Sequence, residues 1–346
     1  MSTSLAPHTP LREVPASERA TLGDLHLAAE RKHERQAVFK RRVAGQVHEV
    51  PDWRFHRNII RLALYLRERL RIQVGDTIAL SGPPSVEWVL ADWAAIVCGA
   101  AAISIDPGSA DLALASAFRQ FAPRVAIADA SSAERLLSLQ GTAPTLQEII
   151  VIDGPVSSER TISLSAALDL GGTLDTAERA NTLRKQIRTI PPSSPALVHA
   201  HPGNALASAW NVMTHEDVVD FIRARREQHP RRKGDVAYVP GAPLSIGGRL
   251  ALYDFVSDGA TCTAFASGES AHHEVELFAP TWIVSEDGAS ESRAPSLPAK
   301  ESKRASAIGS WLRRVSTRMD HLAAYAKSAK RGIDKALGRS RTRRPQ

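Results

Sequence analysis

Short apolar runs alternate with amphipathic segments along most of this chain. Runs of four to six apolar residues with strand length are followed by stretches whose apolar residues recur every three or four positions, as on one face of a helix. The predicted strands are residues 37–41, 47–50, 76–80, 101–105, 125–128, 149–152, 196–200, 236–239, 261–266 and 281–284. The predicted helices are residues 21–35, 51–70, 85–99, 110–121, 132–139, 216–228, 247–256 and 272–278, with a polar helical stretch over 161–190. Strands with continuous apolar runs predict an α/β fold whose parallel or mostly parallel sheets are flanked by helices.

The two ends of the chain differ from its middle. Residues 1–20 are polar, contain three prolines and are expected to be disordered. Residues 21–285 carry the strand and helix pattern and are expected to form one α/β domain. Residues 286–306 are rich in Ser, Ala, Glu and Pro, which predicts a linker. Residues 307–346 are expected to form a basic amphipathic helix and tail.

Most of the positive charge belongs to this C-terminal segment. The net charge is +7, but residues 300–346 alone hold 14 Lys and Arg against three acidic residues, so the rest of the chain is mildly acidic. A basic surface over the whole protein is therefore excluded, and no specific nucleic-acid partner is expected. An apolar stripe runs through the predicted helix, with Trp311 beside it. Residues 307–337 are expected to contact an anionic membrane surface or a helical protein partner, unless the stripe packs on the chain's own body.

Cysteine content and apolar segments indicate the compartment. Cys98 and Cys262 are the only cysteines, which predicts no disulfide framework and a reducing environment. The N-terminus has no apolar core of a signal peptide, and the apolar run over 94–105 is far shorter than the roughly 20 residues that a membrane span needs. The expected location is cytoplasmic, with peripheral membrane association if the basic helix binds lipid.

Three stretches of the chain carry the motifs of one known family. In residues 68–108 the matching positions are Gly75, Asp76, Ala79, Glu87, Trp88, Gly99 and Ala100, and residues 48–66 before them match more loosely. In residues 234–265 the matching positions are Gly234, Asp235, Pro240, Gly259, Ala260 and Phe265. These stretches resemble the adenylate-forming family of acyl-CoA synthetases, luciferases and peptide-synthetase adenylation domains. The matches follow the family's order over about residues 21–285, and the long-chain acyl-CoA synthetases fit best. The resemblance implies the fold of that family's N-terminal portion.

The resemblance also implies a phosphate-binding loop after the strand at 196–200. In the family, glycines let backbone N–H groups surround phosphate oxygens, while a lysine supplies positive charge. Alignment on Thr214 and His215 needs no gap and leaves Gly203 as the one retained glycine of the grip. Leu206 and Trp210 take the places of glycines, and Ala209 takes the place of the lysine. The candidate cofactor-binding positions are therefore Gly203, Thr214 and His215, in a degenerate loop.

The histidines around this loop suggest an alternative. His199 and His201 are spaced so that one strand face could present both to a metal ion, with His215 as a third ligand. The loss of the loop's other polar residues favours a degenerate loop over a metal site, so no metal ligands are predicted.

The family motifs that hold adenine and ribose, and the C-terminal domain with its catalytic lysine, have no counterpart after Val284. No catalytic residue is assigned, and no cofactor is expected; ATP and Mg would bind only if the family activity survives. Three interpretations follow. The chain is a non-catalytic or truncated relative that acts in binding or at a membrane surface, a divergent fatty acid–CoA ligase completed by another chain, or a decayed gene product.

Overall fold

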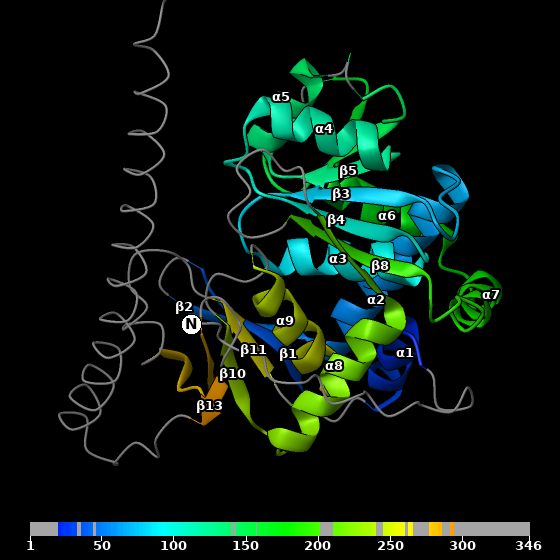
Figure 1. Cartoon of the computed structure of the whole chain (residues 1–346). Helices are drawn as coiled ribbons and strands as arrows, with labels where there is room; N and C mark the ends of the chain where they lie inside the picture. The colour runs from blue at the N-terminus through cyan, green and yellow to red at the C-terminus, as the bar shows by residue number, and fades with distance from the viewer. Residues whose placement is uncertain are drawn as a thin grey trace, which may run out of the picture.

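Two sheets with helices between and around them make up the protein (Figure 1). The computed structural model describes residues 20–32, 36–43, 46–139, 141, 143–156, 158–200, 210–239, 245–259, 262–265, 277–285 and 291–293. Its helices are α1 (Leu22–Lys32), α2 (Asp52–Leu64), η2 (Tyr65–Arg69), α3 (Val86–Val97), α4 (Asp111–Phe121), α5 (Ala130–Ser138), α6 (Leu164–Leu174), α7 (Ala177–Ile187), α8 (His215–Gln228) and α9 (Ile246–Asp258). The short η2 continues α2 as a π-helix.

The larger sheet has the strand order β7-β6-β5-β3-β4-β8-β9. Its strands are β3 (Thr77–Ser81), β4 (Ala101–Ile105), β5 (Val125–Ala128), β6 (Glu148–Val151), β7 (Thr161–Ser163), β8 (Pro195–Ala200) and β9 (Trp210–Thr214). All neighbouring pairs are parallel except β8–β9, which is antiparallel. The order places β3 between the next two strands of the chain, so the carboxyl ends of these strands and of β8 share one edge of the sheet.

The smaller sheet has the order β13-β12-β10-β11-β1-β2. Its strands are β1 (Ala37–Val43), β2 (Gln46–Pro51), β10 (Val236–Val239), β11 (Cys262–Phe265), β12 (Trp282–Val284) and β13 (Glu291–Arg293). The four central strands are parallel, and β2 and β13 are antiparallel at the two edges. The mostly parallel α/β class predicted from the sequence is therefore confirmed.

One core fills the space between the sheets, and a second lies on the outer face of the larger sheet. Along β3, Ile78 and Leu80 face the inner core, while Ala79 faces the outer one. The outer core contains Leu114 and Phe118 of α4, and Figure 1 shows α4 and α5 on that face. Because both faces are covered, the strands can be apolar throughout, which explains their continuous apolar runs in the sequence.

Close contact between α2 and α6 depends on a glycine. A Cβ at Gly171 would overlap the carbonyl oxygen of Arg61, so only glycine lets the two helix backbones approach this closely. Two arginines of α2 reach across this contact. Arg57 and Arg61 both donate hydrogen bonds to the carboxylate of Asp175 at the end of α6.

Several details differ from the sequence prediction. The stretch over 161–190 is not one helical segment, because it holds β7 and two helices separated at Asp175 and Thr176. The strand β9 was not predicted, and β13 lies within residues 286–306, where a linker was expected. Residues 1–19, 272–276 and 307–346, for which disorder or helices were predicted, lie outside the described residues. In the part that is described, no helix is both long and apolar enough to cross a membrane.

A buried ion pair joins the helices of the two sheets. Asp92 of α3 and Arg249 of α9 are 1% and 0% exposed, and the guanidinium donates from Nε to Oδ2 over 2.9 Å and from Nη2 to Oδ1 over 2.5 Å. The hydroxyl of Tyr253 also donates to Asp92, and Arg249 reaches the carbonyl oxygen of Ala102 in β4. A buried charge depends on such partners, because water is not there to solvate it.

This pair predicts a large effect of one substitution. Arg249→Met should lower the free energy of unfolding by about 3–5 kcal/mol, because it leaves the Asp92 carboxylate buried without its counter-ion. Urea unfolding followed by circular dichroism measures the change. Arg41→Met is the matched control: its partner is Glu87 and both side chains are well exposed, so the loss should stay below about 1 kcal/mol. Equal midpoints for the two variants would contradict the structural role of the buried pair.

Candidate functional site

The predicted phosphate loop connects the two strands of an antiparallel hairpin. β8 runs parallel to β4, with Ile103 opposite Val198, and β9 returns beside it with Trp210 opposite Ala200. The carboxyl end of β8 therefore lies at the edge of the sheet where ligands of α/β proteins bind. Gly203 and His201 fall in residues 201–209, between the two strands, and lie outside the described residues.

Thr214 caps the helix that follows the hairpin. Its hydroxyl accepts a hydrogen bond from the backbone N–H of Asp217 at 3.2 Å and donates to the Asp217 carboxylate at 2.7 Å. The same carboxylate accepts the backbone N–H of Thr214 at 2.8 Å, which completes a capping box at the start of α8. The Thr214 hydroxyl thus stabilises the start of α8, directly after β9. Its role in holding a phosphate stays a prediction.

His215 is the first residue of α8 and is fully buried. Among the described residues neither ring nitrogen has a hydrogen-bond partner, whereas the backbone N–H of His215 donates to the carbonyl oxygen of Ser194. Burial lowers the pKa of His215 from 6.5 to about 4, and the negative charge of Asp24 in α1 opposes this shift. The imidazole is therefore neutral at physiological pH. It contributes packing between α8 and the body rather than a positive charge for an anion.

Trp210 occupies a position for which the family resemblance implies glycine. Its indole packs edge-on against the ring of Phe121 in α4, with ring centroids 5.3 Å apart, and joins the outer core. A large side chain at the base of the loop is therefore integrated into the sheet's packing. Backbone N–H groups can surround a phosphate only where side chains leave room, so this packing is unfavourable for the family's grip.

The metal alternative is not supported by the hairpin's geometry. His199 lies near its loop end, while His215 follows Thr214, which pairs with Pro195 at the other end. Four strand residues separate these positions, or about 13 Å, far more than one metal ion can bridge. Within the described ranges, no group of three or more His, Cys, Asp or Glu side chains is placed to hold a metal ion.

Comparison with known proteins identifies the family. The model of the AMP-binding enzyme family matches residues 28–285. This chain belongs to the AMP-binding enzyme family. The family resemblance found in the sequence is thereby confirmed. Among proteins with curated descriptions, none matches the sequence.

Solved structures agree on the fold. A putative long-chain-fatty-acid CoA ligase from Rhodopseudomonas palustris has a TM-score of 0.64 at 14% identity, over 82% of this chain and 65% of that one. A long-chain-fatty-acid-CoA ligase from Archaeoglobus fulgidus gives 0.61 at 16%, over 76% and 50%. A fatty acyl CoA synthetase from Mycobacterium tuberculosis gives 0.61 at 18%, over 74% and 47%. This AMP-binding family member thus spans from about half to two thirds of the length of these structures.

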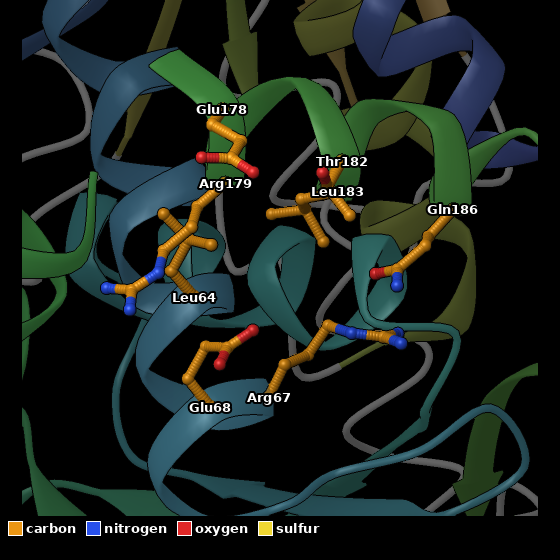
Figure 2. A pocket seen from close by; sticks show the side chains of 8 residues that line it. All are labelled: Leu64, Arg67, Glu68, Glu178, Arg179, Thr182, Leu183 and Gln186. Atoms are coloured by element: carbon orange, nitrogen blue, oxygen red, sulfur yellow. The ribbon is translucent and has the colours of Figure 1, made fainter. Parts of the chain in front are cut away.

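A cavity of about 280 Å³ lies elsewhere in this family member, between α2–η2 and α7. Figure 2 shows Arg67 and Gln186 reaching into it from facing helices, with Glu68 beside Arg67. Arg67 also donates to the carbonyl oxygen of Cys98 at the end of α3. The cavity borders α7, the helix that leads into the amino end of β8, and Thr214 and His215 do not line it.

A buried histidine pair was missed in the sequence. Nδ1 of His26 in α1 lies 3.2 Å from Nδ1 of His56 in α2, so one ring donates and the other accepts. Nε2 of His56 lies 3.4 Å from the carboxylate of Asp52, one helical turn earlier. Burial, and then the charges of His56 and Arg184, lower the pKa of His26 well below its usual value. The spacing of Asp52 and His56 was the available signal, but nothing in the sequence pairs either with His26.

Cys98 was expected to be reduced, and it is also shielded from reaction. It is fully buried, its thiol approaches the carbonyl oxygen of Ala63 at 3.6 Å, and burial raises its pKa to about 12. A nucleophilic cysteine needs the opposite shift. The Cys98 thiol is therefore not an activated nucleophile.

His215 predicts a specific acid sensitivity. Below pH 6.5 the unfolded chain takes up a proton on this imidazole that the folded chain refuses until about pH 4, so stability falls as the pH falls through this window. The free energy of unfolding should fall by about 3 kcal/mol between pH 7 and pH 4, since one pKa unit corresponds to about 1.4 kcal/mol. His215→Leu should remove this part of the slope. Urea unfolding at several pH values between 7 and 4 measures it.

The control for this prediction is His48→Leu on β2, where the side chain is exposed. It should leave the pH dependence of the free energy of unfolding unchanged. If the His215→Leu protein loses stability with acid as steeply as the unmodified chain, burial of a neutral His215 is not the cause.

Proposed function

We propose that this chain is a non-catalytic member of the AMP-binding enzyme family, one that keeps the fold and forms no acyl-adenylate. The observation that carries the proposal is the packing of Trp210 on Phe121 at the base of the phosphate loop. The sequence adds that Ala209 stands where the family resemblance implies the lysine. Electrostatic stabilisation of a transferring phosphoryl group depends on such donors and charges and contributes several kcal/mol.

The two flanking positions support the same proposal. The Thr214 hydroxyl is engaged with Asp217, and the His215 ring is neutral and buried. The Thr214 side chain caps α8 and the His215 side chain fills the core, so both residues have a structural role that does not require a nucleotide.

Nucleotide exchange tests this proposal directly. The purified chain should show no exchange of pyrophosphate into ATP with a series of fatty acids, and no rise in its melting temperature with ATP or AMP. A ligand present at a free concentration of 100 times its Kd adds about 2.7 kcal/mol to the free energy of unfolding, so a true binding site gives a measurable thermal shift. If exchange does occur, the same chain with residues 201–209 replaced by Gly and Ser is the control. Exchange that this replacement abolishes would overturn the proposal.

The competing proposal is a divergent fatty acid–CoA ligase completed by another chain. The intact hairpin and capping box favour it, since an active loop needs the same support. The thermal shift separates the two proposals, because a ligase completed by a partner still grips ATP phosphates with its own loop. A nucleotide-dependent shift of the isolated chain would favour this ligase.

A membrane role is proposed for the basic C-terminal segment. Fourteen Lys and Arg against three acids in residues 300–346 give it a strong attraction to anionic lipid, at about 1 kcal/mol per basic residue near the surface. The full chain should sediment with vesicles that contain phosphatidylserine, while a chain ending at residue 299 should stay in the supernatant. Neutral vesicles are the control, and raised salt should release the full chain. Equal sedimentation of both chains would exclude this role.

A further inference from the structure

A groove runs along the surface where α1, α2 and α7 meet. Two cavities of about 400 and 350 Å³ share Glu30 of α1 and Arg184 of α7 in their linings, so they are neighbours on the surface and are together called the α1–α7 groove. The guanidinium of Arg184 bonds both carboxylate oxygens of Glu30, from Nε at 3.1 Å and from Nη2 at 2.5 Å. This ion pair fixes α7 against α1 at the middle of the groove.

The floor of the groove is apolar, and one end carries an exposed aromatic ring. Leu27, Ile60 and Ala180 line the depression and are 2%, 1% and 5% exposed. Trp53 also lines it and is 57% exposed, the second most exposed large apolar side chain of the described residues after Leu112. A tryptophan in water beside a recessed apolar floor has the composition of an interface centre, where Trp and Arg are enriched.

The walls of the groove carry an excess of positive charge. The charged lining residues are Arg31, Arg57, Arg184, Arg188, Glu30 and Asp175. Glu30 is held by Arg184, and Asp175 accepts from Arg57 at 3.0 Å, so both carboxylates are neutralised within the lining. Arg31 and Arg188 are exposed, and the described part of the chain provides no carboxylate partner for either. Two guanidiniums therefore flank an apolar floor with no counter-charge from the described residues.

We propose that the α1–α7 groove binds an acidic amphipathic segment of a partner protein. Apolar side chains of that segment lie on the floor and against Trp53, and its carboxylates pair with Arg31 and Arg188. Charge complementarity selects the acidic partner, since a basic segment would face the two unneutralised guanidiniums. The recessed floor between helices selects a narrow polypeptide element, as in the docking of an amphipathic helix into a groove.

Fluorescence anisotropy with a labelled peptide tests the groove. The probe is a synthetic 14-residue helical peptide with leucine on one face and glutamate on the other. It should bind the full chain saturably and more weakly as salt is raised. Trp53→Ala, and the double change Arg31→Glu with Arg188→Glu, should each weaken binding about tenfold or more, as is usual for the central residues of an interface.

Matched variants and probes make the result decisive. Phe221→Ala removes an aromatic ring that is 36% exposed on α8, and Arg119→Glu reverses an exposed charge on α4; both should leave the Kd within about twofold. Circular dichroism and urea unfolding confirm that each variant is folded. A peptide with lysine in place of glutamate should not bind.

Three outcomes would overturn the proposal. One is the lack of saturable binding up to about 1 mM peptide, the weak end of specific association. Another is equal loss of binding in the Arg119→Glu control, which would indicate nonspecific attraction. The third is a groove variant that loses sedimentation with phosphatidylserine vesicles while peptide binding is unchanged, since the occupant would then be a lipid surface.

Discussion

The buried pair of Asp92 and Arg249 is the constraint on which the arrangement of this molecule depends. Asp92 lies on α3, which connects β3 and β4 of the larger sheet. Arg249 lies on α9, which lies in the chain between β10 and β11 of the smaller sheet. Each charge is removed from water and satisfied mainly by the other, so separating the helices would expose both to a large desolvation penalty. Apolar packing holds the sheets together, but this pair specifies how α3 and α9 face each other.

The same constraint also supports the hairpin of β8 and β9. Arg249 also bonds the carbonyl oxygen of Ala102 in β4, and β4 pairs directly with β8. The hairpin that presents the phosphate loop is thus positioned from its core side, through contacts that involve no loop residue. Substitutions within residues 201–209 need not affect these contacts, because sites without shared partners act nearly independently.

Strands that are buried on both faces were predictable, because their sequences are apolar without interruption. β7 and β13 escaped prediction because each is short and mostly polar, unlike the equally short but apolar β12. β9 escaped prediction because its residues Asn211 and Val212 are exposed at a sheet edge. Thr214 was singled out by alignment as a loop position, but the structure shows its side chain in a helix cap with Asp217. Pairs such as Asp92 with Arg249 are 157 residues apart, and no local pattern joins them.

Helix α1 connects the two surfaces discussed above. Its first turn places Asp24 where its charge acts on His215, directly after the phosphate-loop hairpin. Two residues on, His26 meets His56 in the core, and Glu30 then pairs with Arg184 in the α1–α7 groove. The inner side of α1 is thus packed through the buried His26, while its outer side forms a wall of the groove. Because the buried contacts fix the position of α1, they also fix the spacing between Glu30 and α7, so the shape of the groove depends on the same buried side of α1 whose Asp24 faces His215.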